Sequence, residues 1–155
     1  MQSSTRIETA LIVYADSSLL VRAYLPDEQD HARACALLRD RDTVVVTGTW
    51  TRIEVAGALV RAARAHRGDQ MLMLDSWERD TGPEGPVTVL SAPQEALEAD
   101  AHDLVITYGI RAVDAWHLAC ASIVVPQIAG DEPVAFASRD KEQAEVAAAR
   151  GFTLV

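Results

Sequence analysis

Short apolar runs alternate along the chain with longer segments in which apolar residues recur with helical spacing. Short runs rich in valine and isoleucine are typical of strands buried on both faces, and helical spacing is typical of helices packed on a sheet. The pattern predicts strands at 10–15, 44–46, 87–90, 134–137 and 152–155, and helices at 17–24, 28–40, 49–67, 69–81, 93–108, 112–124 and 139–150. Alternating strands and helices indicate an α/β fold, with a mainly parallel sheet of four to five strands inside a three-layer α/β/α sandwich.

The length of 155 residues favours one domain, which we place at 10–155 behind a polar N-terminal tail at 1–9. Hydrophobic residues make up 49% of the chain, enough to bury a core. The sequence has no uninterrupted apolar run of the roughly 18 residues that a membrane span needs, and its start lacks the pattern of a signal peptide. We therefore expect a cytoplasmic protein that does not contact a membrane.

The formal net charge of −9 argues against a protein that coats nucleic acid through bulk electrostatics. It is compatible with an enzyme that holds a short piece of RNA, and with a protein that works beside a basic partner. The two cysteines, Cys35 and Cys120, lack the spacing of zinc ligands and are interpreted as buried thiols of predicted helices.

Four acidic residues lie where α/β proteins place their chemistry. Asp16 follows the first predicted strand and Asp140 follows the fourth, while Glu54 and Asp114 lie early in helices with apolar neighbours. Each has a simpler interpretation. Asp16 and Asp140 could be only helix N-caps, Glu54 could be a solvated helix residue, and the helix dipole alone could explain Asp114.

Taken together, the four positions share one edge of a parallel sheet, where open α/β sheets bind ligands. Carboxylates that converge repel one another, and a hard cation such as Mg²⁺ or Mn²⁺ relieves that repulsion. A bound ion of this kind activates water and neutralises charge on a phosphate. The pattern therefore indicates a metal-dependent phosphoryl-transfer site.

The chain resembles the PIN-domain nucleases, and among them the VapC-type toxins of bacterial toxin–antitoxin pairs. The resemblance rests on four stretches in the family's order: IVYADSSLLVRAYLPDE, TRIEVAGAL, YGIRAVDAWHLACA and FASRDKEQAEVAAARGFTLV. It implies a Mg²⁺- or Mn²⁺-dependent endoribonuclease that cuts tRNA, rRNA or mRNA. It also implies a homodimer that is silenced by a cognate antitoxin.

The resemblance assigns roles to six residues of this sequence. Asp16, Glu54, Asp114 and Asp140 match the family's acids in order, so they are expected to be catalytic and to hold the metal. Glu54 would complete the metal shell or accept a proton from the attacking water. Ser17 and Ser138 match hydroxyl positions beside the first and fourth acids, and would orient carboxylates or waters.

Further residues near the acids have two interpretations. His117 could be a metal ligand or a base, although packing at the rim of the pocket is the favoured interpretation, and packing is also favoured for Trp116. Arg22 and Arg139 are candidates for contacts to RNA phosphate. The series Arg61, Arg64 and Arg67 is typical of a solvated helix face, with a phosphate or antitoxin contact as the alternative.

Two other classes of protein remain as alternatives. A phosphate-accepting receiver domain would need an aspartate after the third strand, where this chain has Ser91 and Ala92. A catalytically silent PIN-like module that binds RNA or protein would keep the fold without the chemistry, and the presence of all four acids argues against it.

Overall fold

A five-stranded parallel sheet in the order β3-β2-β1-β4-β5 organises the part of the chain that the structure, a computed structural model, describes, residues 10–155. The predicted tail at 1–9 lies outside the described residues. The strands are β1 (Leu11–Ala15), β2 (Thr43–Gly48), β3 (Val87–Leu90), β4 (Val134–Ala137) and β5 (Thr153–Leu154). The helices are α1 (Ser17–Leu20), the 3₁₀ helix η1 (Val21–Tyr24), α2 (His31–Arg39), α3 (Thr49–Arg64), α4 (Gln70–Asp80), α5 (Gln94–Tyr108), α6 (Ala112–Ala129) and α7 (Lys141–Ala149).

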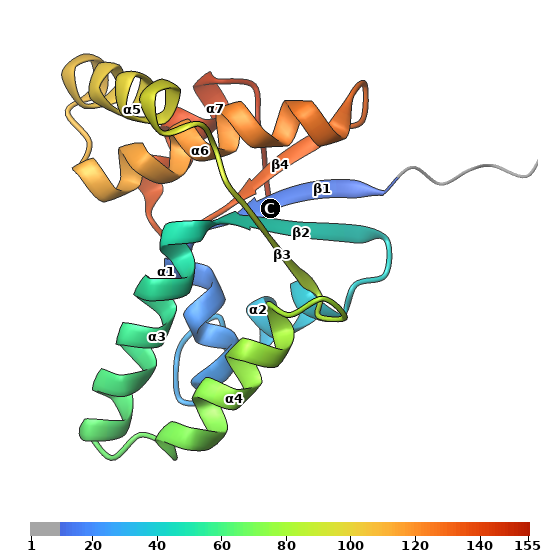
Figure 1. Ribbon diagram of the computed structural model, residues 1–155, viewed down its shortest axis with the longest axis vertical. Coiled ribbons are helices and arrows are strands. Elements are labelled where there is room, and N and C mark those ends of the chain that lie inside the picture. Colours follow the sequence, from blue (N-terminus) through green and yellow to red (C-terminus); the bar gives the residue numbers. More distant parts are fainter. Residues whose placement is uncertain (1–9) are drawn as a thin grey trace, which may run out of the picture.

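Helices cover both faces of the sheet, as the sequence predicts (Figure 1). In β1, Ile12 and Tyr14 point into the core beneath α5, α6 and α7, whereas Val13 and Ala15 point into the core shared with α1 to α4. This alternation follows from the two-residue period of a strand, and it explains why every position in β1 is apolar. The predicted three-layer α/β/α architecture is confirmed.

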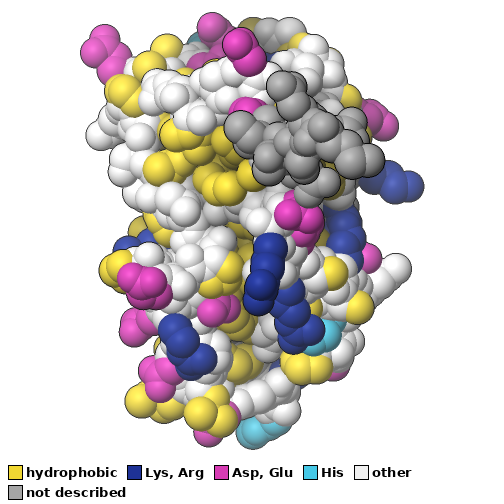
Figure 2. All heavy atoms as spheres, turned by 90° about the vertical axis from the view of Figure 1, so that its right-hand side faces the viewer, with side chains coloured by type: hydrophobic (Ala, Val, Ile, Leu, Met, Phe, Trp, Pro, Cys, Tyr) yellow, Lys and Arg dark blue, Asp and Glu magenta, His cyan; other side chains and the backbone are white. Residues whose placement is uncertain are grey.

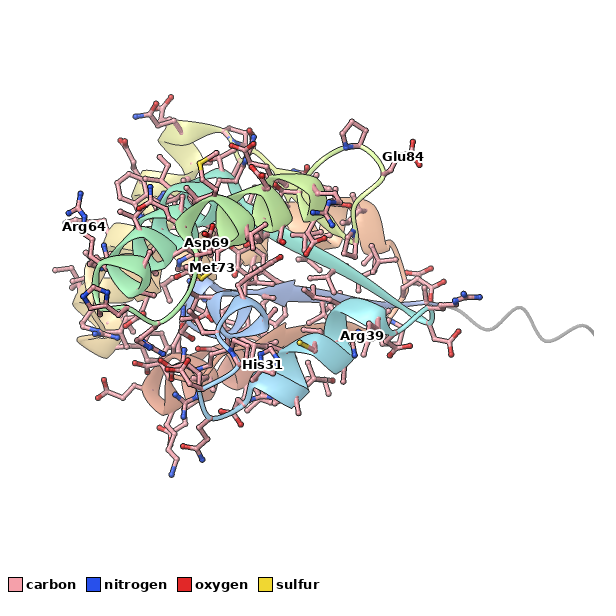
Figure 3. All side chains as sticks on the ribbon, turned by 90° about the horizontal axis from the view of Figure 1, so that it is seen from below. His31, Arg39, Arg64, Asp69, Met73 and Glu84 are labelled. Atoms are coloured by element: carbon pink, nitrogen blue, oxygen red, sulfur yellow. The ribbon has the colours of Figure 1, made fainter. Side chains whose placement is uncertain are left out.

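In the layer formed by α1 to α4, the central elements are α1 and η1, which directly follow β1. Seen from below in Figure 3, α2, with His31 and Arg39 near its ends, and α4, with Asp69 and Met73, flank this segment. The phenol of Tyr24 in η1 packs edge-on against the buried Trp77 of α4 and donates a 2.7 Å hydrogen bond to Asp80. These contacts fix the helices that follow the first acid.

The direction in which the chain adds strands reverses beside β1. From β1 the chain builds outward through β2 to β3, and then returns through α5 and α6 to place β4 on the other side of β1. The register pairs Ala15 with Ala137, so β1 and β4 end side by side. In open α/β sheets the crevice outside such a reversal is the usual ligand site. Figure 2 views the opposite edge, from which the strands start, and shows acidic and basic side chains interspersed with hydrophobic ones.

Helix α6 departs from the prediction in two ways. It was expected to end at 124, but it continues past Pro126 to Ala129. Val124, Val125 and Ala129 are buried, so their packing offsets the one backbone hydrogen bond that the proline removes. Contrary to the expectation that no stretch would be long enough, α6 is also sufficiently long and apolar to cross a membrane, with mean hydropathy 1.3, although half of it is buried inside the fold.

Candidate active site

Asp16 sits at the carboxyl end of β1 and is almost completely buried, with 2% of its surface exposed. Its Oδ1 accepts hydrogen bonds from the backbone N–H of Leu19, at 3.2 Å, and from the Ser18 hydroxyl, at 2.7 Å. Its Oδ2 accepts a 2.7 Å hydrogen bond from Ser138. Burial raises the pKa of Asp16, and the charge of His117 and these hydrogen bonds oppose the rise only in part. The carboxylate is therefore a helix cap with a buried charge that the protein under-compensates.

Ser138 links the first acid to the fourth. Its Oγ lies 2.8 Å from Gln143 Oε1 and accepts a 2.9 Å hydrogen bond from the backbone N–H of Asp140. Asp140 in turn caps α7, accepting from the backbone N–H of Gln143 at 3.0 Å. The Gln143 amide then donates to the backbone carbonyl of Asp114 at 3.2 Å. One hydrogen-bonded network thus joins the ends of β1 and β4 to the starts of α6 and α7.

Arg111 holds the third and fourth acids together. Its Nε donates to Asp114 Oδ2 at 2.8 Å, and its NH2 group donates to Asp140 Oδ2 at 3.0 Å. Asp114 is in the first turn of α6, and 12% of its side chain is exposed, against 74% for Arg111. These contacts raise the pKa of Arg111, chiefly through the hydrogen bond to Asp114. An exposed cation therefore bridges and neutralises two carboxylates.

Glu54 is positioned by a buried chain of hydrogen bonds that starts in the sheet. The backbone N–H of Gly48 donates to the Tyr14 hydroxyl at 3.2 Å, and that oxygen lies 3.0 Å from His117 Nδ1. His117 Nε2 lies 2.7 Å from Glu54 Oε1. An ionised carboxylate only accepts hydrogen bonds, so we assign the proton of this contact to Nε2. His117 is 1% exposed, so it acts as a fixed support for Glu54 and not as a rim residue.

The structure brings all four predicted acids to the carboxyl edge of the sheet. Ser138 and Arg111 link Asp16, Asp140 and Asp114, whereas Glu54 is held separately by His117. In the described part of the chain, no three Asp, Glu, His or Cys side chains are grouped closely enough to hold an ion as they stand. Arg111 contacts two of the carboxylates, and His117 contacts a third.

The hydroxyl predicted to orient the first acid is displaced by one residue. Ser18 makes the contact to Asp16, and both Ser17 and Ser18 line a surface hollow that Glu54 also lines. Position 18 faces the carboxylate because a capping side chain bends back over the first helical turn. Ser138 takes the predicted place beside Asp16.

Sequence reasoning also passed over Arg111 and Tyr14. Arg111 precedes Asp114 by three residues, a spacing that brings side chains together on a helix, and this signal was available in the sequence. Tyr14 carried no comparable signal, because it looks like any aromatic residue of a buried strand.

The arginines proposed for RNA contacts are mostly engaged within the protein. Arg139 pairs with Asp30 at 2.6 Å, and Arg67 pairs with both Asp27 and Glu28. Arg22 donates to the backbone carbonyl of Ser18 and lies 3.7 Å from Glu28. Their role in binding RNA stays a prediction, and Arg22, Arg67 and Arg139 would each have to exchange an internal partner for phosphate.

The fold matches solved structures of the expected class. VapC20 of Mycobacterium tuberculosis, described as a sarcin–ricin loop cleaving toxin, superposes with a TM-score of 0.60 at 17% identity, covering 91% of this chain and 96% of its own. PAE2754 of Pyrobaculum aerophilum superposes with a TM-score of 0.53 at 18% identity, covering 91% of this chain and 81% of its own. No family model and no curated protein matches the sequence. The chain thus has the α/β fold that the resemblance to PIN domains implies, and at this identity the likeness concerns the fold.

Replacing Ser138 with alanine is expected to lower the cleavage rate proposed below about 10- to 100-fold, the usual cost of losing a group that orients a metal-binding carboxylate. The change removes the contacts from Ser138 to Asp16 and Asp140 and leaves every acid in place. Initial rates with a labelled RNA would measure it. Ser17→Ala is the matched control, and an equal loss in that variant would show that the hydroxyl next to Asp16 in sequence is the one that matters.

Proposed function

We propose that this chain is a divalent-metal-dependent endoribonuclease and the toxin half of a toxin–antitoxin pair. One observation carries the proposal: Asp16, Glu54, Asp114 and Asp140, far apart in sequence, lie at one sheet edge beside the reversal of strand order. A buried, under-compensated carboxylate at such a point is typical of a catalytic site. The fold shared with an RNA-cleaving toxin supports the same conclusion.

The chemical type of these side chains is suited to binding Mg²⁺ or Mn²⁺. Hard cations take carboxylate oxygens, and this edge offers carboxylates from four different segments of the chain. Burial raises the pKa of Asp16, and this supports a bound cation, whose positive charge would favour the ionised carboxylate. Arg111 marks where positive charge is favourable beside Asp114 and Asp140, and its exposed side chain is free to move away.

The side chains of the site would have distinct roles in the proposed reaction. Asp16, Asp114 and Asp140 would hold the ion, which when bound supplies an activated water and neutralises phosphate charge. Glu54, kept in place by His117, would accept the proton of the attacking water or complete the shell. Ser18 and Ser138 hold the Asp16 carboxylate, and Gln143 holds the start of α6 through the backbone carbonyl of Asp114. Arg111, once released from the acids, is placed to pair with the RNA phosphate.

The proposed partners follow from the same assignment. The substrate is RNA, with tRNA, rRNA and mRNA all open, and the acidic chain is expected to be silenced by a cognate antitoxin, with a homodimer as the working assembly. We place the protein in the cytoplasm, where these RNAs are. The receiver-domain alternative is disfavoured by topology, because such domains order their strands 2-1-3-4-5 and this sheet does not.

Removing the metal is expected to abolish RNA cleavage and leave the protein folded. The wild-type protein would be assayed on tRNA, mRNA transcripts and an rRNA hairpin carrying the sarcin–ricin loop, with Mg²⁺, with Mn²⁺ and with excess EDTA. Calorimetry with Mn²⁺ alone would report binding independently of activity, and circular dichroism would report folding. RNA binding without cleavage under every metal condition would favour the silent binding module. Equal cleavage in EDTA would overturn the metal dependence.

A further inference from the structure

A cavity of about 560 Å³ opens at the carboxyl edge of the sheet, next to the segment that carries Arg111 and Asp114. Its walls come from the starts of α3, α5 and α6 and from the segment after β3. The residues that line it include Trp50, Gln94, Glu98, Ala112, Val113 and Trp116. Ala112 and Val113 lie between Arg111 and Asp114 in sequence, so the cavity shares a wall with the acidic site.

Two indole rings form the aromatic side of the cavity. The ring centroids of Trp50 and Trp116 are 6.3 Å apart with the ring planes tilted by 47°. Trp116 is partly buried, and its ring packs edge-on against His117 at 5.3 Å. Trp50 is 46% exposed, so a large part of its indole surface faces solvent beside the ring of Trp116. Sequence reasoning interpreted Trp116 as packing; the structure shows that it packs and also lines this cavity.

Two polar side chains of α5, Gln94 and Glu98, also line the cavity, whose remaining lining is mostly apolar. The Gln94 amide donates a 2.7 Å hydrogen bond to Glu98 Oε1, so a carboxylate and an amide oxygen are both offered at the rim. A carboxylate accepts hydrogen bonds from N–H groups and repels phosphate. The cavity is therefore poorly suited to an anion and well suited to a flat aromatic ring that carries N–H donors, because its apolar lining can pack the ring face and Glu98 can accept a hydrogen bond.

We infer that this cavity binds one unpaired base of the RNA substrate, of the kind that carries an exocyclic amino group: adenine, cytosine or guanine. The base would stack on Trp50 and Trp116 and donate its amino N–H to Glu98. RNA-binding proteins recognise unstacked bases in this way, by an aromatic face and by hydrogen bonds to the base edge. Uracil has no amino group and would be disfavoured. The inference rests on the proposed function, because it places the base next to the phosphate that the acids would attack.

The test uses metal-free full-length protein in EDTA with the hexanucleotides rA6, rC6 and rU6. Stacking on an indole quenches its fluorescence, and the third tryptophan, Trp77, is 2% exposed and gives a constant background. We expect rA6 and rC6 to quench the emission and rU6 to bind more weakly. Trp50→Leu keeps apolar volume and removes the stacking face, so it should weaken rA6 binding roughly 5- to 150-fold. Trp50→Phe should restore part of that loss.

Two further variants sharpen the result. Tyr108→Leu removes an equally exposed aromatic ring, 47% exposed at the far end of α5, and should leave binding unchanged. Glu98→Gln should reduce the preference for rA6 and rC6 over rU6, since an amide can also donate to a uracil carbonyl. Normal rA6 binding and quenching by Trp50→Leu would overturn the inference. A dimer that dissociates on sedimentation in Trp50→Leu, with RNA binding intact, would instead assign the cavity to contact between two copies.

The two proposals fail separately. If the wild-type protein binds rA6 through Trp50 but cleaves no RNA with any metal, the base site stands and the nuclease assignment falls. If it cleaves RNA with Mn²⁺ and Trp50→Leu leaves kcat/KM unchanged, the nuclease assignment stands and the base site falls. Mn²⁺ affinity should be the same in Trp50→Leu and the wild type, since the change leaves all four acids in place.

Discussion

Asp16→Asn is expected to abolish metal-dependent RNA cleavage, with a loss of about a thousandfold or more. Metal ions contribute several kcal/mol to stabilising charge in the transition state, and each 1.4 kcal/mol corresponds to a factor of ten in rate. Asparagine keeps the size of the side chain and its capping oxygen for Leu19 N–H, so the fold should persist. Initial rates with saturating Mn²⁺ would measure the loss. Full activity would remove Asp16 from the mechanism.

The same variant should make the metal-free protein more stable at neutral pH. Burial raises the pKa of Asp16 above its ordinary value of 3.8, so the folded state binds this proton more tightly than the unfolded chain does. The free energy of unfolding therefore falls as pH rises from the ordinary pKa through the raised one, and an ionised Asp16 is destabilising above it. Removing the charge recovers that stability at pH 7, and the advantage should vanish toward pH 4.

Thermal unfolding in EDTA across that pH range would check the sign. Asp75→Asn, on the exposed side of α4, is the control, because it removes one acidic charge without touching a buried group. A wild-type protein that is more stable than Asp16→Asn at pH 7 without metal would contradict the account of an under-compensated carboxylate. A gain in stability with a loss of activity is the usual sign that a residue is kept for function.

Phe136→Ala is expected to cost about 3–5 kcal/mol of folding free energy, the largest effect on stability that we predict. Phe136 lies in β4 and is 1% exposed. Its ring stacks on Tyr14 at 5.6 Å and meets Phe152 edge-on at 5.9 Å. Truncation would leave a void between β1, β4 and the start of β5. For a domain of this size the melting temperature should fall by roughly 6–20 °C.

Calorimetry or urea unfolding would measure the change. Ile106→Ala, 73% exposed on α5, removes a comparable apolar side chain from the surface and should stay close to the wild type. If both variants lose the same stability, the aromatic cluster of Tyr14, Phe136 and Phe152 is not a centre of the core. Because Tyr14 also supports His117, activity should decline together with stability in Phe136→Ala.

The fold was predictable from the sequence because buried strands and helices place their apolar residues at regular spacings. The apolar run ending at Ala15 and the run ending at Ala137 mark the two central strands, and the acids that follow them were placed correctly at one edge. Strand ends are predictable since a parallel sheet aligns them. The end of α6 was missed, because the local signal of Pro126 was outweighed by packing of the residues after it.

Contacts between side chains from distant segments could not be predicted in the same way. Nothing in the order of residues says that His117 meets Glu54, or that Arg111 reaches Asp140 across to α7. Both contacts depend on the rotation of one helix relative to another, and a turn of a few tens of degrees would break them. The shift from Ser17 to Ser18 has the same origin, since it depends on where the first helical turn bends.

Gly48 contacts both the residues that support Glu54 and the aromatic side of the cavity. Its N–H donates to Tyr14, the first residue in the series of hydrogen-bonded contacts that supports Glu54. A Cβ at this position would lie 2.6 Å from the ring of Trp116. One peptide unit therefore serves the carboxylate and the aromatic wall together. Any side chain added there would push the indole outward while disturbing the tyrosine, so the aromatic wall and the support of Glu54 both require glycine at position 48.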